Sequence, residues 1–321
     1  MASMRDIKRR KNSVTSTQQI TKAMKLVSTV KLQKARTRAE KTNPYTDKMY
    51  KTVSSMLRKS GNIIHPYLTA GESERKAVIV ITSNRGLAGG YNSNVVKLIT
   101  NGDFKKEDLD IYALGSKGYD ALLRRGYNSN VVKLITNGDF KKEDLDIYAL
   151  GSKGHDMLAR RGYNIKENRS DIMDDPTYDD AMMLCKVVLD SFANGEIGEI
   201  YLAYTHFKNT VTHIPTLIKL LPVDTTGMDE VEVDDNVMMN FEPNTEEALD
   251  LVIPKYVTSL FYGALVESVA SENGARMQAM DSATSNADEI ISDLTLKFNR
   301  ARQGAITQEL TEIIAGANAI N

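Results

Sequence analysis

The hydrophobic pattern changes twice along the chain and predicts a long helix at each end. From Met4 to Lys59 the only helix breaker is Pro44, and apolar residues recur at roughly helical spacing among Lys, Arg, Gln and Thr. These apolar residues are Ile7, Val14, Ile20, Met24, Val27 and Val30. We therefore expect a helix over residues 1–60, kinked at Pro44 because proline removes a backbone hydrogen bond.

The C-terminal pattern is more regular. Apolar and small residues follow one another at alternating spacings of three and four, as in a coiled coil: Met277, Met280, Thr284, Ala287, Ile291, Leu294, Phe298, Ala301 and Ala305. Pro254 suits the first turn of a helix, and the same register extends backward to Leu249. The pattern predicts a coiled-coil helix over residues 245–321, with a long helix packed in a globular core as the alternative.

The two helices can be fitted together as an antiparallel pair. If the seam that ends near Ala305 meets the start of the first helix, facing residue numbers add to about 309. Ile7 would then lie near Arg302, and Met24 near Ser285. Beyond Ala305 the apolar residues move to another face, which comprises Ile306, Leu310, Ile313, Ile314 and Ala317. The last turns are therefore predicted to project as a single helix that needs another partner.

The middle of the chain, residues 75–240, has the pattern of an α/β domain. Residues 76–83 form a continuous apolar, β-branched run, and a glycine-rich turn and a helical stretch follow it. Further strand candidates begin near Leu109 and Glu199 and are separated by helical segments. Buried strands that alternate with helices predict a mostly parallel sheet.

A repeat interrupts this middle segment. Residues 90–128 and 126–164 agree at 36 of 39 positions, at an offset of 36 residues. Two copies of a helix-strand-helix piece do not make a solenoid. We expect one copy to occupy the sheet and the other to form an added helix-strand unit or a protruding segment.

Charge is distributed unevenly, although the net charge of the chain is −1. Residues 1–60 carry a net charge of +13, whereas residues 221–250 contain ten acidic residues and no Lys or Arg. Such asymmetry indicates partners of opposite sign, with two solvated faces as the alternative. The start of the chain lacks a signal peptide's apolar region, and runs such as residues 77–81 are too short to span a membrane. Any membrane association is expected to be peripheral.

Few residues suggest chemistry. Gly86, Gly89 and Gly90 lie between a strand and a helix, where phosphates bind in doubly wound folds, but the spacing does not match a dinucleotide fingerprint and a tight turn explains it better. The four histidines lack metal-ligand spacing, and Cys185 lies on an apolar helix face as a core residue would. The sequence predicts no catalytic site, cofactor or metal. Two alternatives stay open: a nucleotide-binding enzyme and a nucleic-acid-bridging coiled-coil protein.

Four segments resemble those of one family. Residues 4–28 resemble the first helix of F-type ATP synthase γ subunits, and residues 81–92 resemble the glycine turn after their first strand. Residues 259–284 and 298–320 resemble their last helix. Without one 36-residue copy the chain has the usual length of such a subunit, and the absence of a transit peptide favours a bacterial chain.

The resemblance implies a Rossmann-like globular domain inserted between the N- and C-terminal helices of an antiparallel coiled coil. It also implies a central stalk that rotates inside a head of α and β subunits, couples proton flow to ATP synthesis or hydrolysis, and has no active site of its own. The implied partners are the α, β and ε subunits and the c-ring, with no nucleic acid. The implied location is the cytoplasmic face of the cell membrane, reached only through the Fo sector. The coupling ion, H⁺ or Na⁺, is set in the membrane ring.

The resemblance also implies four contact residues. Met24 and Arg276 match shaft positions that meet an acidic loop of the β subunit. Gln303 and Thr307 match positions where the upper shaft meets the head, and the counted seam places both on the outward face.

Overall fold

The structure is a computed structural model. It describes residues 4–60, 65–69, 71, 73–102, 104–125, 127, 147–149, 165–168, 174–223 and 244–320. The chain forms two compact units, a helical unit (Met1–Val30 with Arg276–Asn321) and a sheet unit (Lys31–Ala275).

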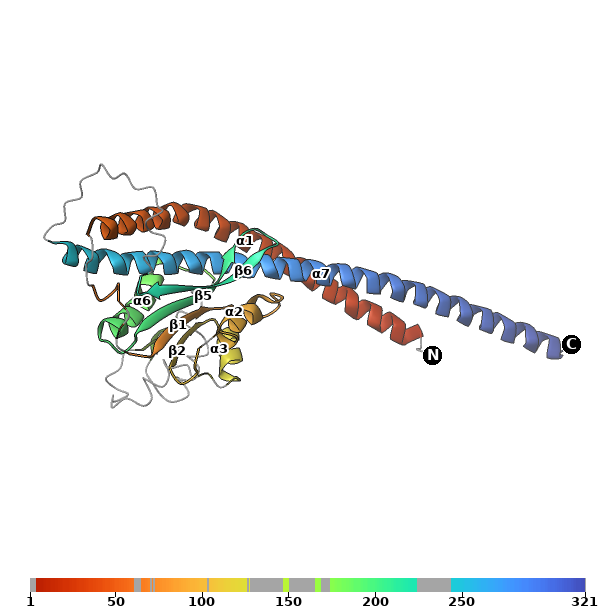
Figure 1. The fold of residues 1–321 in the computed structure, drawn as a ribbon. Helices are drawn as coiled ribbons and strands as arrows, with labels where there is room; N and C mark the ends of the chain where they lie inside the picture. Colours follow the sequence, from red (N-terminus) through yellow and green to blue (C-terminus); the bar gives the residue numbers. More distant parts are fainter. Residues whose placement is uncertain are drawn as a thin grey trace. The chain divides into compact units, whose positions relative to one another are not determined.

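Long helices begin and end the described chain, as the hydrophobic pattern predicts (Figure 1). The elements are α1 (Met4–Ser60), β1 (Lys76–Ile81), α2 (Tyr91–Thr100), β2 (Leu109–Leu114), α3 (Ser116–Leu123), β3 (Ile147–Ala149), β4 (Ile165–Asn168), α6 (Tyr178–Ala193), β5 (Glu199–Phe207), β6 (His213–Leu221) and α7 (Thr245–Ile320). Helix α1 continues through Pro44, and α7 begins before Pro254, which therefore lies inside the helix and not in its first turn.

The sheet unit contains the expected mostly parallel sheet. Its four strands have the order β2-β1-β5-β6. Strand β1 pairs in parallel with both β2 and β5, and β6 returns antiparallel to β5 as a hairpin. The fold prediction, an α/β domain between long terminal helices, is confirmed. The predicted division into residues 1–60, 75–240 and 245–321 stays a prediction.

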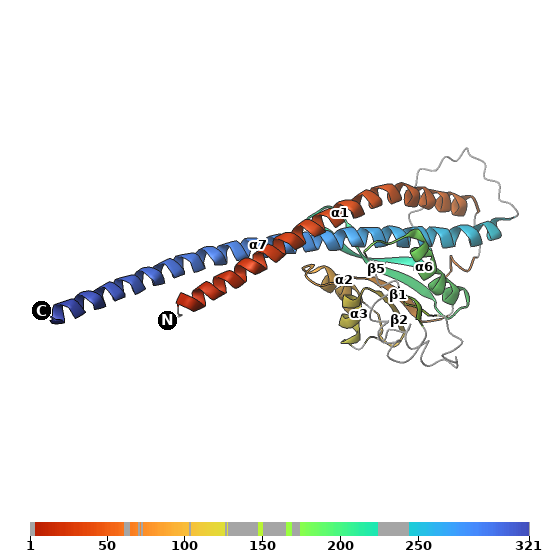
Figure 2. The ribbon, with the colours of Figure 1, turned by 180° about the vertical axis from the view of Figure 1, so that it is seen from behind.

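Helices cover both faces of this sheet (Figures 1 and 2). On one face, Val78 and Val80 of β1 pack with α2, α3 and β2 in a single buried cluster. On the other face, Ser268 and Ser271 of α7 hydrogen-bond the backbone of Thr205 on β5. Because β1 is covered on both sides, its sequence is continuously apolar and does not alternate.

Cys185 lies on the buried face of α6, as the sequence predicts, and is 1% exposed. Burial raises the pKa of its thiol to about 12, so the thiol stays protonated at neutral pH. Helix α6 begins with a capping box in which Thr177 and Asp180 hydrogen-bond each other's backbone amides.

The two copies of the repeat contribute different strands. The first copy supplies α2, β2 and α3, which belong to the four-stranded sheet unit. The second copy supplies β3, which pairs in parallel with β4 in a separate two-stranded sheet. Most of the second copy lies outside the described residues.

Candidate functional site: the paired terminal helices

The helical unit consists of the first part of α1 and the last part of α7, which run antiparallel (Figures 1 and 2). The Thr21 and Thr284 hydroxyls lie 2.7 Å apart, and Lys25 Nζ lies 2.5 Å from Asp281 Oδ1. The Gln18 amide also donates to Asp288 Oδ1. In all three pairs the residue numbers add to 305 or 306.

This register corrects the predicted value of about 309. Met24 therefore lies level with Asp281, about one helical turn from the predicted Ser285. The prediction is wrong because it assumed that the paired seam extends to Ala305. The observed polar pairs between the two helices set a register that is shorter by three to four residues. The same sum appears within the sheet unit, where the rings of Tyr50 and Tyr256 lie 6.3 Å apart.

The seam on α7 is the one that the spacing predicts. The side chains of Met280, Thr284, Ala287 and Leu294 are buried, and those at positions 277, 291, 298 and 301 are half-buried. Ala305 is exposed. Because α1 begins at Met4, the observed register ends the described pairing near Ala301, so the prediction holds up to that residue.

The seam on α1 differs from the predicted one. Ile20 is 60% exposed and Val30 is 70% exposed, whereas Thr21 and Ser28 are buried. The observed seam follows the three-four alternation of Ile7, Lys11, Val14, Gln18, Thr21, Lys25 and Ser28, all of which are buried or half-buried. The same spacing can be counted in the sequence, but the prediction considered only apolar residues and therefore left out the polar residues of the seam.

An apolar face is consequently left outside the helix pair. Leu26 and Val27 are also exposed, and with Ile20 and Val30 they lie within about a third of the circumference of α1, opposite the seam. On α7, the side chains at positions 302–316 are all exposed. They include Ile306, Leu310, Ile313 and Ile314, the face predicted to need another partner. Exposed apolar surfaces of this kind mark interaction sites.

Gln303 and Thr307 are both exposed, like every side chain from position 302 to position 316. The Thr307 hydroxyl donates to the Gln303 carbonyl at 2.9 Å, so its proton is used within the helix and its lone pairs remain available as acceptors. The two residues lie about 40 Å along α7 from Arg276. The four predicted contact residues therefore form two groups, because Met24 is level with Asp281 and close to Arg276 along the helix.

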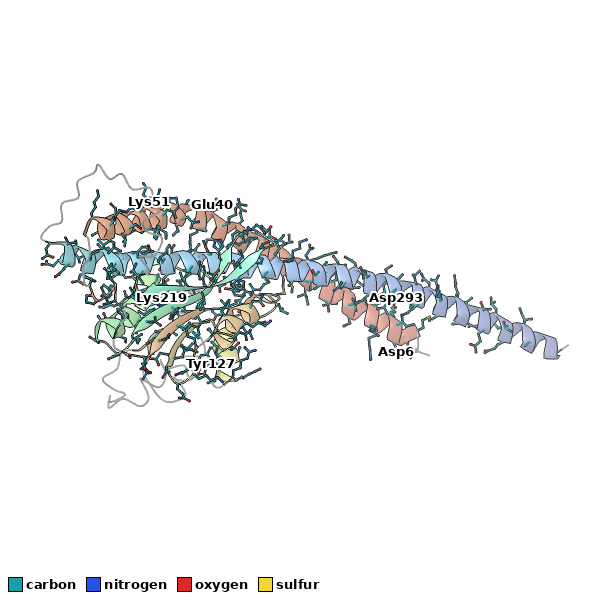
Figure 3. The ribbon with its side chains drawn as sticks, in the orientation of Figure 1. Asp6, Glu40, Lys51, Tyr127, Lys219 and Asp293 are labelled. Atoms are coloured by element: carbon teal, nitrogen blue, oxygen red, sulfur yellow. The ribbon has the colours of Figure 1, made fainter. Side chains whose placement is uncertain are left out.

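Arg276 is buried, with 8% of its surface exposed. A solvated surface arginine would be mostly exposed, so the position is not an ordinary solvent-facing one. Met24 is half-buried beside the seam. Figure 3 marks the two helices of this unit by Asp6 on α1 and Asp293 on α7.

The glycine turn is closed by hydrogen bonds within the protein. Ser83 N–H donates to Asn92 Oδ1 at 2.9 Å, and Tyr91 N–H donates to the Ala88 carbonyl at 3.2 Å. Gly89 has a φ of 55°, which a glycine adopts without strain. These features support a tight strand-helix turn better than a phosphate site.

Three further observations on the described residues bear on binding. A cleft of about 350 Å³ lies in the sheet unit between α1 and the β5–β6 hairpin, and is lined in part by Arg36, Glu40, Lys208 and Glu267. No group of three metal-ligating side chains occurs in the part of the chain that the structure describes. Within α7, the segment Thr245–Gly316 is apolar enough to cross a membrane by composition, but 56% of the apolar window is buried in the protein. A core helix passes the same test, so this is weak support for a membrane span.

Comparison with known proteins decides the family. The family model described as ATP synthase (ATP-synt) matches residues 3–127 and again residues 125–320, a division that falls at the repeat. The ATP synthase gamma chain of Lachnoclostridium phytofermentans is 59% identical over 327 aligned residues, which cover all of both chains. The chain belongs to the ATP synthase γ-chain family. It is a non-catalytic component of the complex, in keeping with the absence of any predicted catalytic residue.

Other relatives and solved structures agree. The ATP synthase gamma chain of Alkaliphilus metalliredigens is 41% identical and covers 99% of this chain and 98% of its own. That of Acetobacterium woodii, named sodium ion specific, is 37% identical over 99% of both. A chain of the Euglena gracilis mitochondrial ATP synthase has a TM-score of 0.61 at 16% identity, with 99% and 94% covered. A chain from the Tetrahymena thermophila central stalk and c-ring has a TM-score of 0.53 at 23% identity, with 82% and 99% covered.

Proposed function

We propose that this chain is a rotating shaft that couples ion flow through a membrane ring to ATP synthesis or hydrolysis in a head of α and β subunits. The observation that carries the proposal is the surface of the helical unit, in which the seam contains polar pairs beside its apolar residues while further apolar side chains of α1 and α7 are exposed. A free helix pair would normally bury its apolar residues, whereas a shaft enclosed by protein gains by presenting them. Rotation of an asymmetric shaft would take the β subunits through their nucleotide states in turn.

The proposed partners are the α and β subunits around the helical unit, and ε and the c-ring at the sheet unit. The solved relatives support this arrangement, because one comes from a central stalk with its c-ring and another from an assembly of F1 with the c-ring. If the c-ring anchors the complex in the membrane, this chain is a peripheral membrane protein. We propose that it lies at the cytoplasmic face. The net charge of +13 over residues 1–60, with few aromatic residues, favours acidic protein surfaces over nucleic acid as the neighbour of α1.

Four residues are proposed to make the rotor-stator contacts. Met24 and Arg276 would meet an acidic loop of the β subunit, and Gln303 and Thr307 would meet the head higher on the shaft. The exposure of Gln303 and Thr307 supports their availability. Because Arg276 is buried, we expect it to reach a β-subunit carboxylate only with its guanidinium, as a charge-assisted hydrogen bond.

The test is ATP synthesis by the assembled complex in reconstituted vesicles. The double variant Gln303→Ala with Thr307→Ala should fold normally and lower the synthesis rate about tenfold or more, because losing contacts of about 1.5–3 kcal/mol raises the barrier of a rotary step. Thr52→Ala is the matched control, since Thr52 is also exposed and also donates to the carbonyl four residues earlier. Arg276→Lys keeps the charge and tests the planar guanidinium.

Two outcomes must be separated. Wild-type synthesis in the double variant would remove the contact assignment but leave the rotor function intact. Failure of the wild-type chain to co-purify with tagged α and β subunits would contradict the rotor function itself. Driving synthesis with a proton gradient or a sodium gradient in the same vesicles identifies the coupling ion of the assembled complex.

A further inference from the structure

Three basic side chains of α1 lie along one face of the helix, within the part of α1 that belongs to the sheet unit. Lys31, Lys34 and Arg38 follow one another at spacings of three and four, so helical geometry places them side by side. Lys31 Nζ lies 2.5 Å from Asp174 Oδ1, in the turn before α6. Each of the three directly precedes a buried residue of α1: Leu32, Ala35 and Ala39.

Arg38 makes two separate contacts with the same turn. Its Nη2 lies 2.5 Å from Asp175 Oδ1, and its Nη1 donates to the Pro176 carbonyl at 2.9 Å. Lys34 Nζ lies 3.5 Å from the other oxygen of the same carboxylate. The hydrogen bond from Arg38 lowers the pKa of Asp175, so the carboxylate stays ionised at neutral pH. Because two nitrogens of one planar guanidinium are held, α1 is fixed in both position and rotation relative to this turn.

The turn continues without a break into α6, which also contacts α7. Thr177 follows Pro176 directly and is the capping residue of α6. The ring of Tyr178, in the first turn of α6, meets the ring of Tyr262 on α7 edge to face, with centroids 5.8 Å apart. Burial and the neighbouring Tyr45 of α1 raise the pKa of the Tyr178 hydroxyl. The start of α6 therefore contacts both long helices.

Another charged pair on the same stretch of α1 provides a contrast. Arg36 Nε lies 2.8 Å from Glu40 Oε1, one helical turn further along α1. Both residues line the cleft of about 350 Å³ between α1 and the β5–β6 hairpin. The ion pairs with Asp174 and Asp175 thus join α1 to α6, whereas the pair of Arg36 and Glu40 joins α1 only to itself.

We propose that Arg38 and Asp175 are positioning residues that pass torque between the sheet unit and α1 when the shaft turns. The inference rests on the proposed rotary function and adds a path for the force. A shaft of two helices transmits torque through both only if each is held to the body that turns with it. Helix α7 is held by Ser268 and Ser271, which hydrogen-bond Thr205 of β5, and α1 is held by Arg38. Partly exposed ion pairs contribute little to folding stability, so this junction acts by preventing α1 from sliding past α6.

The test measures ATP hydrolysis and ATP-driven ion pumping by the assembled complex in the same vesicles, against ion gradients of increasing steepness. Without a gradient, Arg38→Ala should hydrolyse ATP within about twofold of the wild-type rate, because the shaft still assembles with the head. Against the steepest gradient, the number of ions pumped per ATP should fall by about fivefold, since the load on the junction is then largest. A folding defect would instead lower hydrolysis and pumping together at every gradient.

Arg36→Ala is the matched control, because it removes an arginine from the same stretch of α1 without breaking a contact with α6. It should pump like the wild type at every gradient. Arg38→Lys keeps the charge but not the planar pair of contacts, and should recover part of the loss. The inference is overturned if the wild type is coupled and Arg38→Ala pumps like Arg36→Ala at every gradient. A wild-type complex that hydrolyses ATP but pumps neither H⁺ nor Na⁺ would contradict the proposed function itself.

Discussion

The two units of this chain differ in how they bury their side chains. In the sheet unit, Val78, Val80 and Ile81 are fully buried. In the helical unit, Thr21 and Thr284 are buried against each other, while isoleucine, leucine and valine side chains of α1 are exposed. The sheet unit therefore contains its own core, whereas the apolar surface of the helical unit is suited to being covered by another protein.

This difference separates stability from assembly. Burial of apolar area stabilises the sheet unit directly, at about 25 cal/mol per Å². In the helical unit the same side chains contribute little until a partner removes them from water. Substitutions at buried apolar positions should therefore lower the free energy of unfolding, and substitutions at exposed apolar positions should weaken association with other subunits.

The largest effect is expected at Phe261, a fully buried side chain of α7 in the sheet unit. Phe261→Ala should lower the free energy of unfolding by about 3–5 kcal/mol, because it removes apolar burial and leaves a cavity. The measurement is the urea unfolding midpoint of the isolated chain, followed by circular dichroism.

Ile20→Ala is the control for that change. Ile20 is exposed on α1, so the free energy of unfolding should change by no more than about 0.5 kcal/mol. Association with α and β subunits should weaken instead. A loss of stability as large as that of Phe261→Ala would show that the α1 face is covered within the chain, and the contrast between the units would fail.

A smaller effect is expected from acid at Glu199. Burial raises the pKa of this carboxyl, but hydrogen bonds from Lys219, Lys76 and Tyr201 outweigh it and lower the pKa from 4.5 to about 2. Lys219, on the edge strand β6, is labelled in Figure 3. Because the folded pKa lies below the unfolded value, the stabilisation is complete above about pH 4.5 and is lost as pH falls toward about 2. Its size at neutral pH is about 3 kcal/mol at most.

Unfolding midpoints measured from pH 7 to pH 2 test this cluster. Glu199→Gln should be less stable than the wild type at pH 7, and the difference should shrink as pH falls. The control is Asp281→Asn, which removes an exposed ion pair with Lys25 in the helical unit and should cost less than about 1 kcal/mol. A constant difference between wild type and Glu199→Gln across the whole range would contradict the assigned shift.

The smallest effect is expected in the polar seam. Thr21→Val or Thr284→Val should each cost about 1 kcal/mol, because each removes the hydroxyl contact across the seam and leaves the other hydroxyl to bond only a carbonyl of its own helix. The double variant should cost less than the two single changes added together, with a coupling of about 0.5–1.5 kcal/mol. Strict additivity in a double-mutant cycle would mean that the two hydroxyls do not stabilise the pair.

Sequence reasoning succeeded where a single regular pattern dominates. The seam of α7 through Ala301 and the buried strand β1 both follow from the pattern of residues alone. Family membership followed from long matching segments and is confirmed by the comparisons. The contact roles of Met24, Arg276, Gln303 and Thr307 stay predictions, because the surfaces that they would meet belong to other chains.

Tertiary structure decided the rest. The buried face of α1 includes Gln18, Thr21 and Ser28, and a polar side chain is stable there only when its hydrogen bonds are satisfied, which depends on the register of the opposite helix. The repeat gives the sharpest example, since Ile111–Ala113 and Ile147–Ala149 are identical and lie in different sheets. The sequence by itself determined that each segment can form a strand. The position of each strand in a sheet depends on which neighbouring strand it can pair with and on the length of the loop that this pairing closes. Only the folded molecule defines both.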